Sequence, residues 1–124
     1  MSRALLLVGH GSHLNADSSA PVYAHARTIR DRGVFDHVLT AFWKEEPSLS
    51  RALDGCDSDD VTVVPVFMSA GYFTNEVIPR EMGLSGQVSR VHGKKVRYTA
   101  PAGSHHALAH AIVQRAREAG ATPG

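Results

Sequence analysis

Four short runs rich in apolar and β-branched residues alternate with longer stretches of mixed character along the chain. The runs are Ala4–Val8, Val38–Trp43, Val61–Met68 and Lys95–Thr99. Their lengths are typical of strands, and the first run is apolar throughout, as expected of a strand buried on both faces of a parallel sheet. Pro65 lies inside the third run, so this strand is predicted to bend or to lose a neighbour there.

The stretches between the runs predict helices. One helix is expected from Ser19 to Arg32, where a serine and a proline can open it and a glycine can end it. A shorter helix is expected over Ser48–Asp54, and a helical turn over Asn75–Ile78. The last helix is expected behind the capping residue Ser104. One side of it carries Leu108, Ala111, Ile112 and Arg115.

The order of these elements predicts the fold class. Strands that alternate with helices favour a parallel sheet with helices on both faces, so we expect a three-layer α/β/α domain around a four-stranded parallel sheet. Residues 1–120 are expected to form this single domain, and residues 121–124 a frayed tail. The segment Ser85–Lys94 shows little apolar periodicity and is predicted to be a mobile flap or a linker.

Composition narrows the class of protein. With 124 residues, 43% of them hydrophobic and 20% charged, the chain suits one globular domain. A net charge of +1 gives no reason to expect nucleic-acid binding, and no apolar run approaches the length of a membrane span. The first apolar run ends in Gly-His-Gly and is predicted to be a strand, not a signal peptide. The single Cys56 cannot form an internal disulfide, which fits a cytoplasmic location.

Polar and aromatic side chains follow all four predicted strands. The carboxyl ends of parallel strands meet at one edge of a sheet, and ligands bind at such edges. We therefore expect a functional rim. Its members are His10, Ser12 and His13 after the first strand, Glu45 and Glu46 after the second, Ser69, Gly71, Tyr72, Phe73 and Glu76 after the third, and Ser104, His105 and His106 after the fourth. For His10 taken alone, a histidine held in a tight turn remains the alternative.

Imidazoles and carboxylates on one rim point to metal or acid–base chemistry. Both groups bind divalent first-row metals, and a neutral histidine is also a base near neutral pH. The chain lacks a cysteine pair, an H-E-x-x-H motif, a P-loop and a dinucleotide fingerprint, which excludes the sites that those motifs build. Ser12 does not lie in a G-x-S-x-G elbow, so a small hydrolase that uses Ser12 and a rim histidine is a weaker alternative.

Four ordered motifs resemble the short sirohydrochlorin cobaltochelatases, which are class II tetrapyrrole chelatases. The motifs are Val8–Ser12, Glu46–Ser48, Val64–Gly71 with Ile78–Arg80, and Tyr98 with Pro101–Gly103. The resemblance implies a chelatase domain that pairs as a homodimer. It also implies insertion of Co²⁺, or of Ni²⁺ or Fe²⁺, into sirohydrochlorin for cobalamin biosynthesis. The metal would be a substrate, and neither ATP nor an organic cofactor would be needed.

The resemblance also implies roles for individual residues. His10 would bind the metal and accept pyrrole protons. The family usually has a second histidine and an aspartate where this chain has Phe73 and Val77, so a ligand is missing. Glu76 is the predicted substitute in metal binding and catalysis, and Glu46 and His105 are further candidate ligands. The residues expected to bind the tetrapyrrole are Gly11, Ser12, His13, Ser69, Gly71, Tyr72 and Phe73.

Two functions therefore stay open. The first is an active chelatase with an altered ligand set, which the retained His10 favours. The second is a non-catalytic relative that binds a tetrapyrrole or a metal, which the missing histidine favours, because a fold does not guarantee an activity.

Overall fold

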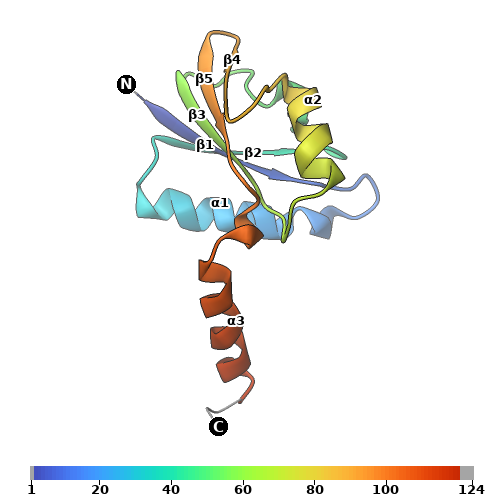
Figure 1. Ribbon diagram of the computed structural model, residues 1–124, viewed down its shortest axis with the longest axis vertical. Coiled ribbons are helices and arrows are strands. Elements are labelled where there is room, and N and C mark those ends of the chain that lie inside the picture. The colour runs from blue at the N-terminus through green and yellow to red at the C-terminus, as the bar shows by residue number, and fades with distance from the viewer. Residues whose placement is uncertain (1, 121–124) are drawn as a thin grey trace.

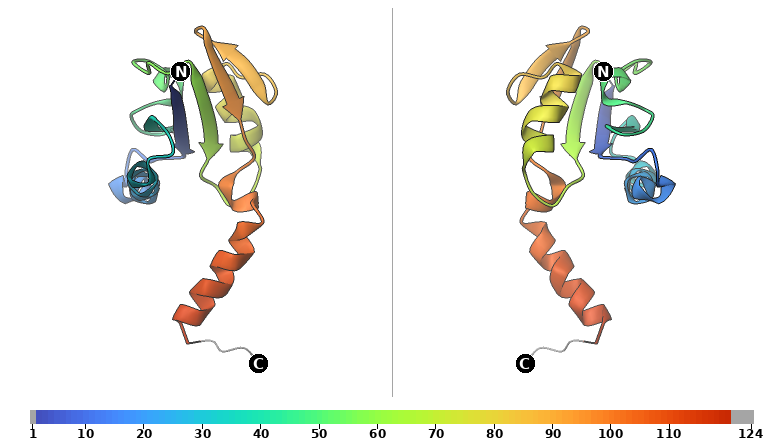
Figure 2. Two further views of the ribbon diagram at one scale, coloured as in Figure 1. Left: turned by 90° about the vertical axis from the view of Figure 1, so that its left-hand side faces the viewer. Right: turned by 90° about the vertical axis from the view of Figure 1, so that its right-hand side faces the viewer.

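The computed structural model describes residues 2–120, which form one five-stranded sheet with a helix on each face (Figure 1; Figure 2). The strands are β1 (Arg3–Gly9), β2 (His37–Phe42), β3 (Asp60–Pro65), β4 (Val88–Val91) and β5 (Lys94–Tyr98). The helices are α1 (Ala20–Arg32), α2 (Ile78–Met82) and α3 (Ala107–Glu118). Shorter turns are η1 (Ala16–Ser18), η2 (Leu49–Arg51), the π-helical η3 (Phe73–Val77) and η4 (Ala102–Ser104). The predicted tail 121–124 lies outside the described residues.

The sheet has the order β2-β1-β3-β5-β4, and its first four strands in this order run parallel. The prediction of an α/β domain is confirmed, and β3 ends at Pro65, where the sequence predicts a lost neighbour. No helix among the described residues has the length and apolar character that crossing a membrane requires.

Two hydrophobic clusters lie on opposite faces of the sheet. On the α2 face, Leu6 and Val63 are fully buried beneath Ile78. On the α1 face, Leu5 and Leu7 pack against helix residues of which Ala26 is fully buried. Successive residues of a strand point to opposite faces, so a central strand covered on both sides needs the unbroken apolar run that β1 has.

The interpretation of Ser85–Lys94 as a flap or linker is wrong, because this segment contains β4. β4 pairs antiparallel with β5 and adds a fifth strand at the edge of the sheet. The two strands are joined by His92 and Gly93, whose φ angles are 51° and 78°, as a tight hairpin turn requires. An edge strand with two exposed positions carries little hydrophobic periodicity, which explains why the pattern missed it.

The helix predicted over Ser48–Asp54 is reduced to the 3₁₀ turn η2. Its hydrogen bonds span three residues, as in Arg51 N–H to the Ser48 carbonyl (3.2 Å) and Ala52 N–H to the Leu49 carbonyl (3.3 Å). Such a short segment cannot complete several α-helical bonds before the chain turns, so the tighter bonding pattern prevails.

The last predicted helix exists, but it does not pack on the sheet. α3 projects away from the domain, and none of its residues is buried (Figure 1; Figure 2). Ser104 does not cap it, because the Ser104 hydroxyl donates to the Pro101 carbonyl (2.7 Å). At the start of the helix, Ala107 N–H donates to His105 Nδ1 (3.1 Å).

Candidate functional site

His10 lies just beyond the carboxyl end of β1 and is exposed. Its backbone is fixed from the neighbouring strand, because the amides of Trp43 and Lys44 both donate to the His10 carbonyl (3.2 and 2.8 Å). The loops after β1 and β2 therefore form one unit, which holds the histidine at the sheet edge where ligands of α/β proteins bind.

The hydrogen bond of the imidazole fixes which nitrogen carries the lone pair. His10 Nδ1 lies 3.0 Å from the Gly11 carbonyl oxygen. A carbonyl can only accept, so Nδ1 is the protonated nitrogen of the neutral ring and Nε2 carries the lone pair. Nε2 can therefore bind a metal ion or take up a proton.

Aromatic rings enclose one side of this histidine. The His10 ring centroid lies 5.3 Å from that of Trp43, edge to face, and 5.6 Å from that of Phe73. Trp43 and Phe73 are 5.5 Å apart, and Phe67 extends the cluster at 4.8 Å from Phe73. Phe73 occupies the place where the resemblance expects a second histidine. Three aromatic side chains, Trp43, Phe67 and Phe73, therefore form an apolar surface beside the imidazole of His10. We call this surface the aromatic wall.

Glu45 is the site residue whose role sequence reasoning missed. Its Oε1 accepts the Ser12 N–H (3.0 Å) and so holds the loop that carries His10. Gly11 makes this contact possible, because its φ is +71° and a Cβ there would lie 2.8 Å from Glu45 Cγ. The predicted ligand Glu46 instead is exposed and accepts the Ser48 N–H (3.1 Å). The sequence shows two adjacent glutamates, Glu45 and Glu46, after the second strand. Only the fold shows that Glu45 is the one that contacts the loop carrying His10.

The turn after β3 is held together by Thr74. The buried Thr74 hydroxyl accepts the Gly71 N–H (2.9 Å), and the Thr74 carbonyl accepts the Tyr98 hydroxyl (2.5 Å). Burial raises the pKa of Tyr98 to about 12. Glu76 is exposed on this turn, which leaves its carboxylate accessible to a ligand.

Most of the predicted tetrapyrrole-binding residues are exposed. Tyr72 has 66% of its surface accessible, and its hydroxyl beside the guanidinium raises the pKa of Arg80. The exposed members of the predicted set are His13, Ser69, Gly71 and Tyr72, whereas Gly11 is buried and Ser12 and Phe73 are half-buried.

His105 lies on the other side of the sheet from Trp43 and Phe73. Its ring stacks on His106 (4.2 Å between centroids) and lines a cavity with Ile29 and Val64, which belong to the α1 face. Trp43 and Phe73 pack on the α2 face. Within residues 2–120 no three His, Cys, Asp or Glu side chains gather into a group that could hold a metal ion. The four predicted ligands, His10, Glu46, Glu76 and His105, therefore do not assemble into one metal centre within a single chain.

The sequence of the chain is similar to those of known chelatases. Residues 4–119 match the CbiX family. The chain is 47% identical to a probable sirohydrochlorin cobaltochelatase of Halobacterium salinarum, over 92% of this chain and 45% of that protein. It is 35% identical to the sirohydrochlorin cobaltochelatase of Methanopyrus kandleri, over 65% of this chain and 59% of that protein. The chain thus spans about half the length of these relatives.

Solved structures show the same fold. A multi-domain Deinococcus radiodurans protein, described as similar to chelatases, matches with a TM-score of 0.92 and 40% identity, over 98% of this chain and 30% of that one. The sirohydrochlorin chelatase SirB of Bacillus subtilis subspecies spizizenii, solved with cobalt, matches with a TM-score of 0.77 and 21% identity, over 95% of this chain and 51% of that one. Since the family match extends over nearly all of the described residues, this chain belongs to the CbiX family.

Proposed function

We propose that this chain inserts a divalent metal ion, cobalt foremost, into sirohydrochlorin without ATP, with His10 as metal ligand and base. The observation that carries the proposal is the accessible imidazole with its lone pair on Nε2, held beside the aromatic wall. The names of the relatives from H. salinarum and M. kandleri support the substrate and the metal.

A single strong ligand suits the transfer of a metal ion. Chelation exchanges the protein ligand for four ring nitrogens and releases two pyrrole protons. An imidazole that holds Co²⁺ without help from a second histidine lets the ion go easily. Once the ion has left, Nε2 can accept one of the two protons, and the other passes to water. The metal ion is a substrate here, so a site that binds it loosely favours turnover.

The aromatic wall suits the other substrate. A tetrapyrrole is flat and apolar across its faces, and aromatic side chains stack on such rings. Its edge carries carboxylates, for which the site offers two cations. Lys44 Nζ lies 4.0 Å from the Trp43 ring centroid, and Arg80 is exposed beside Tyr72. We propose that Lys44 and Arg80 bind the carboxylates of the macrocycle.

Glu76 remains the proposed second metal ligand. It is exposed on η3, the turn that begins with Phe73, so it lies close in sequence to the residue in the place of the family's histidine. Carboxylates bind Co²⁺ and Fe²⁺ less tightly than imidazole does, which again favours release. Homodimerisation and a cytoplasmic location stay predictions.

One observation favours a second candidate function, the binding of a tetrapyrrole without chelation. The described residues contain no group of three metal-binding side chains, so the site resembles a binding surface more than a metal centre. In this case the aromatic wall would bind the macrocycle, and His10 would coordinate a metal that the macrocycle already carries.

Anaerobic absorbance of sirohydrochlorin mixed with Co²⁺ separates the two functions. A chelatase accelerates insertion over the uncatalysed reaction, and His10→Ala lowers the rate at least about 100-fold, as expected when a ligand and base is lost. The matched control is His37→Ala, because His37 is an exposed histidine at the opposite end of the sheet. Saturable binding of the macrocycle with no acceleration by Co²⁺, Ni²⁺ or Fe²⁺ would establish the binding protein instead.

A further inference from the structure

Two histidines lie one turn apart at the start of α3. His106 precedes the helix with helical backbone angles (φ −60°, ψ −24°), so it is in register with the turns that follow. His110 lies four residues later, and both histidines are exposed. Side chains at this spacing share one side of a helix, with about 5–6 Å between their Cβ atoms. The helix therefore presents two imidazoles to solvent next to each other.

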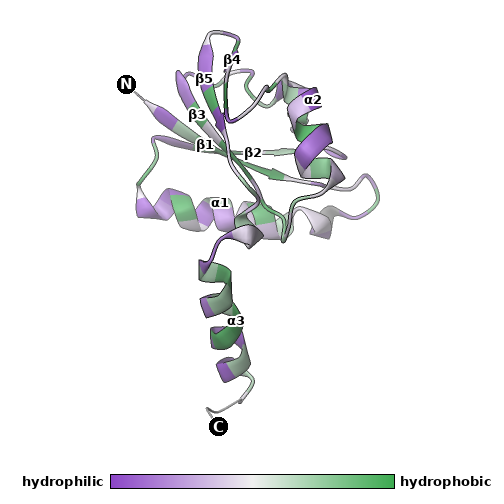
Figure 3. Cartoon of the chain, viewed as in Figure 1, coloured by the Kyte–Doolittle hydropathy of each residue, from purple (hydrophilic) through white to green (hydrophobic). Residues whose placement is uncertain are grey.

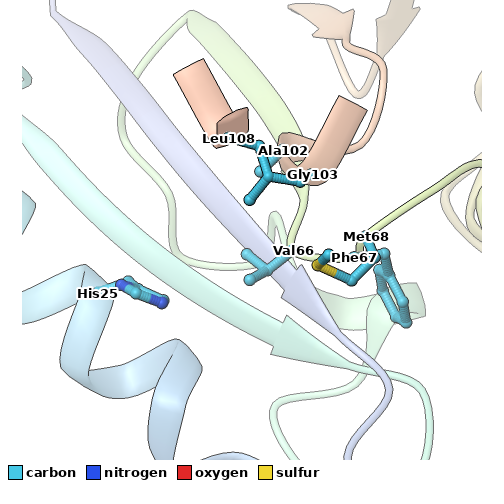
Figure 4. A pocket seen from close by; sticks show the side chains of 7 residues that line it. All are labelled: His25, Val66, Phe67, Met68, Ala102, Gly103 and Leu108. Atoms are coloured by element: carbon cyan, nitrogen blue, oxygen red, sulfur yellow. The ribbon is translucent and has the colours of Figure 1, made fainter. Parts of the chain in front are cut away.

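The two histidines lie on the polar side of α3. The apolar side, visible in green in Figure 3, is formed by Leu108, Ala109, Ile112, Val113 and Ala116. Leu108 lines a cavity of about 460 Å³ in the domain together with Val66 and Gly103 (Figure 4). His106 and His110 are each two residues from Leu108, which is about 200° of rotation around a helix with 3.6 residues per turn. Packing on the apolar side therefore leaves this histidine pair accessible.

His105 orients one member of the pair. Ala107 N–H donates to His105 Nδ1 (3.1 Å), and the His105 ring stacks on that of His106 with 4.2 Å between their centroids. The lone pair of His105 Nδ1 is thus already engaged with the backbone. The stacked ring restricts the orientations of the His106 imidazole, which lowers the entropy that metal binding would cost.

Two imidazoles at this spacing bind divalent transition metals. Neutral imidazole is a ligand of Co²⁺, Ni²⁺, Cu²⁺ and Zn²⁺, and histidines one helical turn apart reach a common ion, as they do in the H-E-x-x-H motif. No group of three metal-binding side chains exists within residues 2–120, so water molecules would complete the coordination. Arg117 is seven residues beyond His110 on the same side, which is about 10 Å along the helix axis. Its charge therefore leaves room for a cation at the pair.

We propose that His106 and His110 form a second metal site, which binds a divalent transition-metal ion such as Ni²⁺ or Co²⁺ with water as the remaining ligands. The site is separate from His10, because it lies on the helix that projects from the domain (Figure 1). It takes the class of ion that the chain is proposed to insert, but it does not depend on insertion. A site with two protein ligands exchanges its ion readily, which suits an ion that is held and then passed on.

Calorimetric titration with Ni²⁺ at slightly alkaline pH tests the site in a His10→Ala chain, in which the proposed ligand His10 is absent. We expect saturable binding, and at least about a tenfold rise in the dissociation constant when His106→Ala or His110→Ala is added, because the second imidazole of a chelating pair multiplies the affinity of the first. Alanine favours a helix more than histidine does, so a lost helix would not explain the loss. The control His25→Ala removes an exposed histidine of α1 that has no histidine one turn away, and should leave the affinity unchanged. Absence of Ni²⁺ binding, or an affinity that His110→Ala leaves unchanged, overturns the proposal.

A relocated histidine tests the spacing. His110→Ala combined with Ala111→His keeps the number of histidines but turns the second imidazole by about 100° around the helix, so this chain should bind Ni²⁺ as weakly as His110→Ala alone. Amide hydrogen exchange gives a second readout. Ni²⁺ should slow exchange across α3 in the His10→Ala chain but not in the relocated variant, because an ion that joins two consecutive turns stabilises the helix. Full affinity in the relocated variant, or exchange that Ni²⁺ leaves unchanged, contradicts a site built on the helix. Neither readout involves metal insertion, so a failure of the chelatase proposal leaves both unchanged.

Discussion

The two faces of the sheet differ in how completely one chain covers them. On the α2 face, η3, α2 and the loops after β1 and β2 enclose a continuous core and support His10 with contacts from within the same chain. On the α1 face, α1 packs on β1 and β2, and an open cavity of about 1130 Å³ lies beside it between Ile29, Val64 and Pro101. His10, Trp43 and Phe73 therefore lie on the face that the elements of one chain cover more completely.

The largest expected effect is on the loop that carries His10, through Gly11→Ala. We expect a loss of about 3 kcal/mol in the free energy of unfolding, because alanine is strained at a φ of +71° and its Cβ would press on Glu45 and on Phe42 Cβ at 2.9 Å. Gly33→Ala is the control, since its φ is +66° but its Cβ would meet nothing within 4 Å. Its expected cost is about 1 kcal/mol. Urea unfolding measures both, and equal losses would contradict the packing argument.

Two neighbouring valines of β3 test the comparison of the faces directly. Val63 is fully buried on the α2 face, and Val64 is half-buried and lines the cavity on the α1 face. Val63→Ala should cost about 2 kcal/mol of unfolding free energy, because it leaves a cavity in a closed core. Val64→Ala should cost under about 1 kcal/mol, because its side chain already borders an open cavity. Similar losses in urea unfolding would show that the α1 face is as closed around Val64 as the α2 face is around Val63.

The sequence predicts those parts of the fold whose pattern depends on burial alone. β1 is predicted because both of its faces are covered, which demands an unbroken apolar run. β4 is missed because its outward positions lie at an exposed edge. The periodicity of α3 predicts the helix but not its direction, because the direction depends on the contact of Gly103 with Met68, 35 residues earlier in the chain.

In the candidate site too, the sequence predicts some contacts and misses others. Strand ends that meet at one edge predict that His10 and Phe73 approach each other, and the structure brings their rings together. The same reasoning groups His105 with them, although it lies on the α1 face, because a loop at a strand end can turn to either face of the sheet. The contact of Glu45 with Ser12 joins residues 33 positions apart, and no local pattern shows which of two adjacent glutamates makes it.

A smaller effect is expected for Glu45→Ala, which removes the acceptor of the Ser12 N–H. The loss of unfolding free energy should be about 1 kcal/mol, and the rate of metal insertion should fall about tenfold with little change in KM, because the loop that holds His10 loosens. Glu45→Gln should restore most of the rate, since its amide oxygen can accept the same hydrogen bond. Glu46→Ala is the control, and a larger effect there would assign the supporting role to Glu46 instead.

The smallest effect concerns Tyr98, whose hydroxyl joins β5 to η3 on the α2 face. Its pKa is raised by burial from 10.0 to about 12, so between these values the unfolded chain loses the phenolic proton while the folded chain keeps it. The wild type then binds more protons folded than unfolded, and this contribution to its stability decreases as the pH rises from about 10 to about 12. Tyr98→Phe has no proton to lose there. The stability difference between wild type and Tyr98→Phe, measured by urea unfolding, should therefore be constant below pH 9 and shrink above pH 10. A difference that stays constant up to pH 12 would mean that Tyr98 is as accessible in the folded chain as in the unfolded one, and that the α2 face is less closed at β5 than at β1.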